Sequence, residues 1–491
     1  MTLAPAPAVA LQATSTPAAT ENGRDGKADK ADTSEKKKTS SQDNEKKPDK
    51  AKKAKKGKKA KKAKSNGASN GDGESDAAES GEIHRLSWKQ HPSLRYGNVF
   101  RLDAEAKFQE DGRSSYPGGL THAGLEPFEL HRNRVGISGY LFKKVEYEVE
   151  RELTEKELSE KDIAAGVAPK NQWRDVNVNL TFIKNAQLQV GRFKIPFGLD
   201  TLTGIAHNDF VYRTLGANYL TPSRDTGAMV HGRFFKHGLN YWVGAFQHDG
   251  DNARSKKIQG GDETVAARLT GTPLRPLSER AFGGLEIGSA FANSRLTDDS
   301  FRPNGLRGRT LLTQDTFFEP VYVKGRRYRW EAEADWTFGP GSARAEYTVV
   351  LDNRRGQGLH GEDLTDARSR SWYVSGTWLL SGETKKRPVK PAGDFLMGGW
   401  GAVEVVARIE RLWFDSVGSG QGYRSPRAEF LLPEGEKAFT AGVNWTLNRF
   451  IKLQVNGIRE SVEQRDRNPV LGERFPKAAF WNGVARLQLV L

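Results

Sequence analysis

The amino-acid sequence predicts an all-β protein: a transmembrane, sixteen-stranded antiparallel β-barrel that follows a disordered N-terminal tail. The first reason is that apolar and polar residues alternate at every second position over much of the chain from about residue 97 to 491. A strand with this alternation has one apolar and one polar face. The second reason is that long polar connections alternate with turns of a few residues, which is typical of outer-membrane barrels.

The alternation is clearest in residues 326–337. One face of this strand is apolar and the other polar: Tyr328, Trp330, Ala332, Ala334 and Trp336 against Arg329, Glu331, Glu333, Asp335 and Thr337. The first face is expected to meet lipid and the second to meet water in a lumen. On the same argument we expect seven aromatic residues to face lipid: Tyr328, Trp330, Trp336, Tyr347, Trp372, Trp378 and Trp445.

The composition agrees with such a barrel. Only 36% of the residues are hydrophobic, while the chain contains 52 Gly, 24 Phe, 12 Tyr and 11 Trp. This balance suits strands that are apolar on one side only. No run of about eighteen apolar residues is present, which excludes a membrane-spanning helix. The absence of cysteine excludes disulfides, thiol nucleophiles and cysteine metal sites.

Sixteen segments show the strand pattern. A closed antiparallel barrel whose two chain ends lie on the same side of the membrane requires an even number of strands. The segments are 97–108, 128–141, 143–152, 174–183, 187–192, 226–235, 239–247, 263–271, 281–291, 326–338, 342–352, 370–380, 398–414, 437–447, 450–463 and 478–491. The connections after odd-numbered strands are long and polar, as expected outside the cell, and most of those after even-numbered strands are short periplasmic turns. Two periplasmic connections are longer, 272–280 and 381–397, and the pattern gives no reason for the second.

Residues 1–80 have a different composition, and the barrel domain is assigned to 95–491. We interpret residues 1–13 as a truncated secretion-signal remnant and 14–80 as a disordered tail rich in Lys and Ala. Residues 46–64 contain twelve lysines. Such a run attracts polyanions, and nucleic acid, lipopolysaccharide, anionic lipid and cell-wall polymer all remain open. Specific nucleic-acid binding is not expected, because no aromatic residues are interleaved to stack bases.

Signals of enzymatic activity are weak. The nine histidines lack HExxH spacing, and neither a GxSxG elbow nor a Walker phosphate loop occurs. The sequence HDGDN at 248–252 offers oxygen ligands for Ca²⁺, but we interpret it as a surface turn rich in Asp and Gly. No catalytic residue, metal site or cofactor is therefore predicted.

Several segments resemble the phosphate-selective porins O and P. GNVFRLDAEAKF at 97–108 resembles the family's first strand, and the segment beginning FELHRNRVG at 128 resembles its arginine-bearing second strand and hairpin. The most specific piece is QLQVGRFKIPFGLDTLTG at 187–204, and similar late strands follow at 401–412, 441–460 and 484–491. The resemblance implies a homotrimeric channel of the bacterial outer membrane for small inorganic anions, surrounded by lipid and lipopolysaccharide. It also implies that the third loop, about 193–225, folds into the lumen and holds the selecting region.

An anion that leaves bulk water needs fixed donors in place of its hydration shell, and Arg offers paired donors to an oxyanion. The candidate pathway residues are Arg192, Lys194, Arg213 and Arg224 on or beside the third loop, Arg101, Arg132 and Arg134 on the first strands, and Arg408 on a late strand. Each of these could instead be solvated or paired with an acid. Arg132 and Arg134 share a strand phase with Leu130, so their face is open. We expect Pro196, Phe197 and Gly198 to shape the bend into the loop.

The predicted function is thus an outer-membrane channel for small anions, with phosphate or a related oxyanion first. One alternative is a general diffusion pore with slight anion preference, because many acids share the predicted lumen face, including Glu331, Glu333, Asp335, Glu346, Glu404 and Glu410. A second alternative is a surface scaffold or adhesion barrel whose lysine tail binds polyanions. Step conductance in a planar bilayer discriminates between a channel and an occluded scaffold.

Overall fold

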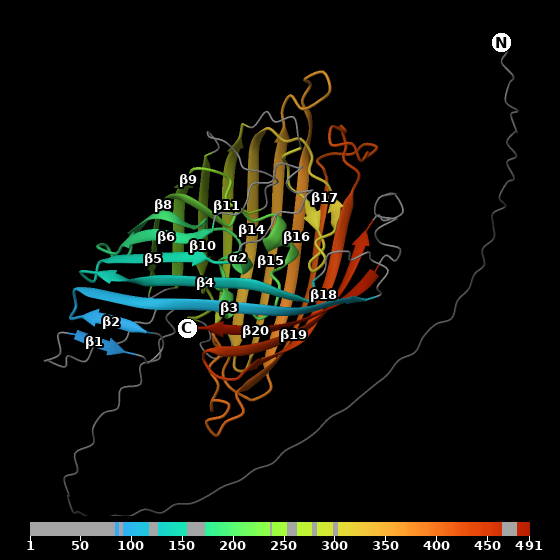
Figure 1. Ribbon diagram of the computed structural model, residues 1–491. Helices are drawn as coiled ribbons and strands as arrows, with labels where there is room; N and C mark the ends of the chain where they lie inside the picture. The colour runs from blue at the N-terminus through green and yellow to red at the C-terminus, as the bar shows by residue number, and fades with distance from the viewer. Residues whose placement is uncertain are drawn as a thin grey trace, which may run out of the picture. The chain divides into compact units, whose positions relative to one another are not determined.

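One large antiparallel sheet dominates the computed structural model, and most of its strands close into a barrel (Figure 1). The structure describes residues 84–87, 92–116, 126–154, 172–235, 238–252, 263–276, 282–297, 303–463 and 479–491. The predictions for the signal remnant and for the tail at 14–80 lie outside these residues. No helix in the described ranges is long and apolar enough to cross a membrane.

The barrel wall contains sixteen of the eighteen strands that the sheet has within the described residues. They are β3 (Phe100–Tyr116), β4 (Phe128–Leu141), β5 (Val145–Glu152), β6 (Trp173–Leu180), β7 (Gln187–Lys194), β8 (Arg224–Phe234), β9 (Leu239–Phe246), β10 (Thr264–Gly271), β11 (Leu285–Leu296), β14 (Gly325–Phe338), β15 (Gly341–Arg354), β16 (Leu364–Leu379), β17 (Ala402–Ser416), β18 (Glu434–Thr446), β19 (Ile451–Glu463) and β20 (Ala479–Val490). Each strand pairs with the next, and β20 pairs with β3 from Trp481↔Tyr116 to Val490↔Lys107, which closes the barrel.

The predicted number of barrel strands is confirmed, and most strand ends agree within a few residues. The largest difference is β3, which continues to Tyr116 instead of ending at 108. Residues 109–116 are polar on both faces, so the alternation that marks a membrane strand is lost there. Their backbone nevertheless pairs with β20 on one side, and residues 109–112 also pair with β4 on the other.

A hairpin that the pattern did not reveal precedes the barrel. β1 (His84–Ser87) pairs with β2 (Ser93–Tyr96), and β2 pairs with the first residues of β3. β2 therefore occupies the edge of β3 just beyond the stretch that β20 covers. Figure 1 shows both short strands beside β3, on the side of the barrel where the C-terminus lies.

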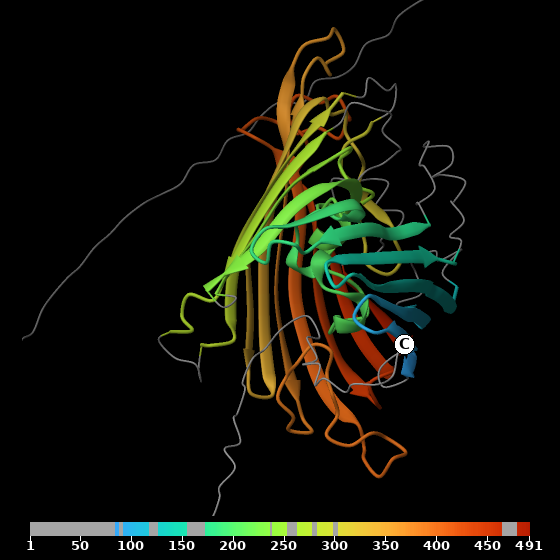
Figure 2. The same cartoon turned by 90° about the vertical axis from the view of Figure 1, so that its left-hand side faces the viewer.

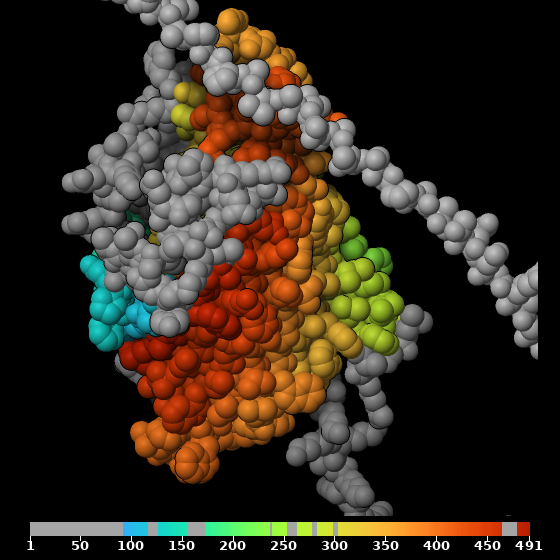
Figure 3. All heavy atoms as spheres, turned by 90° about the vertical axis from the view of Figure 1, so that its right-hand side faces the viewer, coloured from blue at the N-terminus to red at the C-terminus, as the bar shows by residue number. Residues whose placement is uncertain are grey.

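Side chains of the barrel wall alternate between buried and exposed positions. On β14, Arg329 and Glu331 are 0% exposed, whereas Tyr328 and Trp330 are 38% and 45% exposed. The buried set faces the lumen, because Arg329 donates to the carbonyl of Leu220 in the third loop. The seven aromatic residues predicted to face outward all lie at exposed or half-buried positions. Figure 3 shows the outer face of β17 to β20, in orange and red, as a continuous surface.

An apolar core lies inside the barrel. Residues of the third loop, including Leu215 and Leu220, and of the segment 303–323 pack against inward side chains of β15 to β20. That segment contains the short strands β12 (Gly308–Arg309) and β13 (Thr316–Phe318), and Phe318 stacks on Phe414 of β17 at 4.2 Å between ring centroids. Figure 2 shows the third loop, in green, between the blue and cyan strands and the orange and red strands. This packing fills the lumen beside β15 to β20.

A charge on the outward face is expected to destabilise the barrel in proportion to its depth. Ile409 is the central residue of β17 and is 50% exposed, while Trp378 is next to the periplasmic end of β16. Ile409→Arg should cost about 2 to 4 kcal/mol and Trp378→Arg about 0 to 1 kcal/mol. Urea unfolding of the protein in lipid vesicles measures both. Equal losses for the two variants would show that Ile409 does not face the bilayer centre.

Candidate functional site

The third loop, 195–223, connects β7 to β8 and contains three short helices. These are α2 (Leu199–Leu202), the 3₁₀ helix η1 (Ile205–His207) and α3 (Leu215–Tyr219). The side chain of Thr214 caps α3 by accepting from the Ala217 N–H at 3.1 Å. At the start of the loop, Gly198 has φ +87°, and an added Cβ would lie 2.8 Å from Thr221 Cγ2. Only glycine therefore allows this bend.

Carboxylates on the barrel wall accept hydrogen bonds from the backbone of the inner segments. Glu346 Oε2 of β15 accepts from the Asp200 N–H at 3.1 Å, and Glu410 Oε2 of β17 accepts from the Leu215 N–H at 2.6 Å. Both N–H groups belong to first turns of helices, which lack partners within the helix and carry partial positive charge. Both acids face the lumen as predicted, but they serve as anchors of the loop.

Basic and amide side chains anchor the loop from the other direction. Arg408 donates to the Tyr212 carbonyl at 3.0 Å, Arg486 to the Val211 carbonyl at 2.6 Å and Asn444 to the Asp209 carbonyl at 2.8 Å. These three donors lie on β17, β20 and β18. The loop thus leaves the barrel wall at β7 and makes these three hydrogen bonds on the opposite wall.

The HDGDN sequence is not a surface turn, which corrects the prediction. Asp249 is 0% exposed and binds the guanidinium groups of Arg327, at 2.6 Å, and Arg329, at 2.8 Å. Asn252 donates to the carbonyls of Ala217 and Thr221 at 2.9 and 3.1 Å. Because Asp249 and Asn252 are used in this way, the motif is a clamp on the end of the third loop.

A cavity of about 280 Å³ lies between this loop and the strands β3 to β8. Its charged lining consists of the cations Lys107, Arg134, Lys194 and Arg224 and the carboxylates Glu148, Glu150 and Asp175. The remaining lining residues are Gln189, Phe193, Gly204 and Ile205. Three of the eight predicted pathway residues therefore meet at one cavity: Arg134, Lys194 and Arg224.

Arg134 and Arg224 are held by acids. Arg224 forms a two-pronged pair with Asp175, its Nη2 lying 2.6 Å from Oδ2. Arg134 binds Glu150 at 3.0 Å and Glu152 at 2.6 Å. These pairs fix the guanidinium groups in place and compensate much of their charge.

Lys194 and Arg213 instead bind backbone carbonyls where α2 ends. Lys194 Nζ donates to Thr201 O at 2.7 Å and to Leu202 O at 3.1 Å, and Arg213 Nη2 donates to Thr203 O at 2.7 Å. Cations suit this position because carbonyls at a helix C-terminus carry partial negative charge. Burial, reinforced by nearby guanidinium groups such as Arg224, lowers the pKa of Arg213, although an Arg remains charged at neutral pH.

A β-bulge settles the face of Arg132. Across the strand pair, Gln109 is opposite Arg132 but Glu110 is opposite Leu130, so His131 is an extra residue. Arg132 consequently points into the lumen and donates to Gln109 Oε1 at 2.8 Å. It also interacts electrostatically with Arg134 and Arg213.

The remaining three predicted residues lie in different surroundings. Arg192 pairs with Asp251 at 2.6 Å, close to the cavity, since Asp251 also accepts from the Arg224 N–H. Arg101 pairs with Asp103 at 2.6 Å near the periplasmic end of β3. Arg408 pairs with Glu410 at 2.8 Å and lines a separate cavity of only about 10 Å³. The structure thus groups six of the predicted residues and leaves Arg101 and Arg408 outside the group.

Two sets of lumen cations were missed. Lys107, which binds Glu150 at 2.5 Å, shares the strand phase of Arg101 and could have been recognised from it. Lys385 and Arg387 come from the long periplasmic connection at 380–401, and Lys385 Nζ lies 2.6 Å from Asp209 of the third loop. That connection therefore enters the barrel, which explains its length, but no strand periodicity marks its residues.

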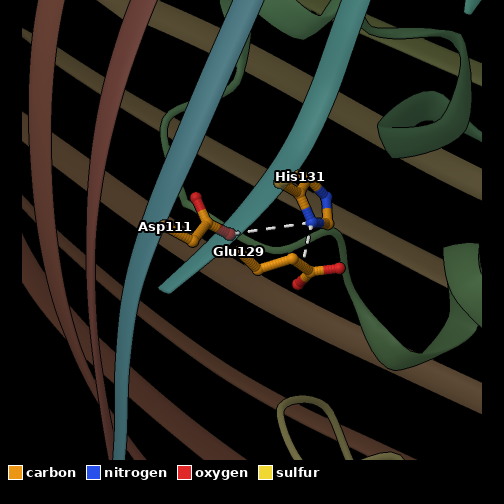
Figure 4. A group of neighbouring side chains, drawn as sticks. All are labelled: Asp111, Glu129 and His131. Carbon is orange, nitrogen blue, oxygen red and sulfur yellow. Dashed lines mark ion pairs between the residues drawn. The ribbon is translucent and has the colours of Figure 1, made fainter. Parts of the chain in front are cut away.

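His131 lies between two carboxylates (Figure 4). Its Nδ1 is 3.6 Å from Asp111 Oδ2 and 3.7 Å from Glu129 Oε2. Arg486 binds Asp111 through two nitrogens, and Arg113 binds Glu129 at 2.6 Å. Because guanidinium groups already compensate both carboxylates, the group is disfavoured as a cation site.

Comparisons with known proteins show what the chain is similar to. A sequence model of the family described as phosphate-selective porin O and P matches residues 121–475. Porin O of Pseudomonas aeruginosa is 22% identical over 411 residues, which are 75% of this chain and 86% of that protein. Solved structures that resemble the chain include OmpTdeltaL8, a loop-deletion mutant of an outer membrane protein of Vibrio cholerae, with TM-score 0.48 and 10% identity over 80% of this chain and 100% of that chain. An anion-selective porin from Comamonas acidovorans has TM-score 0.46 and 12% identity over 79% and 99% of the two chains.

The family match covers most of the barrel, including β4 to β19 and the third loop between β7 and β8. It agrees with a closed barrel wall that is apolar outside and polar inside. The protein is a channel of the bacterial outer membrane rather than an enzyme, and it belongs to the phosphate-selective porin O and P family.

Proposed function

We propose that the channel passes small inorganic anions along the cavity between the third loop and β3 to β8, with phosphate or a related oxyanion as the first candidate. The observation that supports this most is the cavity lining, in which four cations face three carboxylates. Lys194 Nζ donates there to backbone carbonyls, and among the described residues it has no carboxylate partner. Its charge is therefore compensated less than that of Arg224, which has a carboxylate partner.

Three acids of the lumen wall bind the inner segments and do not line the cavity. Glu346 and Glu410 bind backbone N–H groups of the third loop, and Glu460 of β19 binds the Leu311 N–H at 2.5 Å. Their negative charges are thus directed at helix starts and loop backbone on the far wall. Arg132 and Arg213 add positive charge on the side of the cavity, because in the described part of the chain Arg132 donates only to Gln109, and Arg213 binds a carbonyl with Asp200 4.0 Å away.

The electrostatic field of these cations favours the entry of an anion. Tight binding of that anion would also need free hydrogen-bond donors. Most guanidinium donors in the described lumen are already used by acids or carbonyls. We therefore expect a modest anion preference with weak, reversible phosphate binding, which permits a solute to enter and also to leave. The chemical class of the solute is a small oxyanion or halide.

Bilayer recording of the full chain tests the proposal. Under a KCl gradient, the reversal potential should have the sign of anion preference, and added phosphate should reduce the chloride current. A reversal potential near zero without phosphate block would support a general diffusion pore. A barrel that inserts without any step conductance would support a scaffold.

The assembly that the family resemblance implies is a homotrimer, and we propose it for this chain. We also propose that outer-membrane lipid and lipopolysaccharide surround the outward aromatic residues, since Trp and Tyr favour the two membrane interfaces.

A further inference from the structure

We propose that the tip of the periplasmic connection between β16 and β17 inserts into the periplasmic lipid leaflet and anchors there the segment that supports the third loop. The inserted side chains are those of Leu396, Met397 and Trp400. This role concerns the partner of one surface and does not depend on which solute the channel passes.

Three large apolar side chains are displayed together at this tip. Leu396, Met397 and Trp400 are 86%, 83% and 82% exposed. Turns that face water usually carry Gly, Asn, Asp or Ser. Single exposed apolar residues are common, but an exposed apolar cluster marks a contact surface. The described part of the chain leaves this cluster uncovered, so its partner is supplied from outside.

The backbone of the tip holds these side chains outward. The N–H groups of Met397 and Gly399 both donate to the carbonyl of Asp394 at 3.1 Å. Leu396 has φ +67°, a left-handed conformation that residues other than Gly, Asn and Asp rarely adopt unless their surroundings impose it. Because its own hydrogen bonds close the turn, the outward position of the apolar side chains is fixed.

The neighbouring strands mark the level of the membrane interface. Trp336, Trp378 and Trp445 lie on the outward face, each at or next to the last residues of β14, β16 and β18. Short turns follow β14 and β18, so this is the periplasmic rim. Aromatic girdles at the two rims of an outer-membrane barrel lie at the boundary between lipid tails and headgroups.

The tip is joined to this girdle by direct contacts. Phe395 packs edge-on against Trp445, with 5.0 Å between the ring centroids. The indole N–H of Trp445 donates to the Trp400 carbonyl at 2.8 Å, and the Phe395 N–H donates to the Leu447 carbonyl at 2.8 Å. The apolar tip is therefore continuous with the lipid-facing surface of β18. This continuity favours lipid over a periplasmic protein as its partner.

The first part of the same connection reaches into the lumen. Lys385 Nζ lies 2.6 Å from Asp209 Oδ1 of the third loop, and the Lys385 side chain is fully buried. Arg387 Nη1 lies 2.9 Å from Asp335 Oδ1 of β14. One connection thus contacts the third loop near its start and lipid at its tip, so insertion of the tip restrains the segment in the lumen.

Depth-dependent fluorescence quenching tests the insertion. Because the chain contains no cysteine, Met397→Cys supplies a single thiol for a fluorophore in the full chain, folded into vesicles of phosphatidylethanolamine and phosphatidylglycerol. Lipid that carries a nitroxide near the headgroup should quench this fluorophore more strongly than lipid with a nitroxide deep in the acyl chains. Ile409→Cys, central in β17, should show the reverse order. Ser419→Cys, exposed in the connection between β17 and β18, should be quenched by neither lipid.

Two results of this experiment would overturn the proposal. If neither lipid quenches the label on Met397→Cys, the tip lies in water. If the label escapes quenching and the unlabelled variant forms disulfide-linked dimers, the tip is a contact between copies of the chain.

Hydrogen exchange tests the anchoring of the third loop. Combined Leu396→Ser, Met397→Ser and Trp400→Ser substitutions remove the apolar side chains of the tip. In vesicles, the backbone N–H groups of residues 199–220 should exchange faster in this variant, because the supporting connection has lost its lipid contact.

The matched control removes three exposed apolar side chains from extracellular connections, through Leu359→Ser, Val417→Ser and Tyr423→Ser. It should leave the exchange of residues 199–220 unchanged. Equal exchange in the tip variant and in the natural chain would contradict the anchoring.

Discussion

Asp249→Ala is expected to lower the free energy of unfolding by about 3 to 5 kcal/mol, because it leaves two buried guanidinium groups without their shared acid. Arg327 and Arg329 side chains are 1% and 0% exposed, and both bind Asp249. Arg327 retains its pair with Asp352, but Arg329 retains, among the residues that the structure describes, only neutral partners such as the Leu220 carbonyl. Urea unfolding in lipid vesicles measures the loss.

The matched control is Asp363→Ala. Asp363 also pairs with an arginine, Arg355 at 2.8 Å, but their side chains are 55% and 62% exposed. An exposed pair contributes little to stability, because solvent screens its charges. Asp249→Asn should fall between the two, since it retains hydrogen-bonding atoms while losing the charge. Unchanged unfolding of Asp249→Ala would mean that water or another acid replaces the carboxylate.

The barrel itself was predictable because membrane and water impose opposite demands on alternate residues. Where this contrast is strong, as at Tyr328 and Arg329, sequence and structure agree. Where both faces of a strand are polar, as at 109–116 of β3, periodicity no longer marks the strand. The hairpin β1–β2 was missed for a related reason, since four residues per strand are too few for a periodic pattern.

The positions of the site residues were only partly predictable. The bulge at His131 changes the face of Arg132 relative to Leu130, yet a single inserted residue leaves no periodic trace. Asp249 and Lys385 find their partners in or across the lumen, Lys385 at a residue 176 positions away in sequence. The alternation of apolar and polar residues predicts which residues of the barrel wall face inward. Which of the inward cations have a carboxylate partner depends on how the segments between strands fold within the lumen.

The second prediction concerns those cations. Replacing Lys194 and Arg132 together with glutamine should reduce the permeability of anions relative to cations. A fixed unit charge about 7 Å from a permeating ion changes the electrostatic energy of that ion by roughly 0.6 kcal/mol in water. At an effective dielectric constant of 20 the change is roughly 2.4 kcal/mol. Each cation is therefore expected to change the preference by roughly 3-fold to 50-fold, and glutamine retains donors for some of the carbonyls that Lys194 binds.

The control variant also removes one arginine and one lysine charge, but at positions where solvent screens them. Arg355 lies in an extracellular connection and Lys390 in a periplasmic one, and both are exposed. Charges more than about 8 Å from the ion path are largely screened at physiological salt. Arg355→Gln with Lys390→Gln should thus leave the reversal potential nearly unchanged. Recording at low salt gives the sharpest comparison, because weaker screening enlarges every electrostatic effect. If the Lys194 and Arg132 variant keeps both the reversal potential and the phosphate block of the natural chain under those conditions, the cavity beside the third loop does not select the ion.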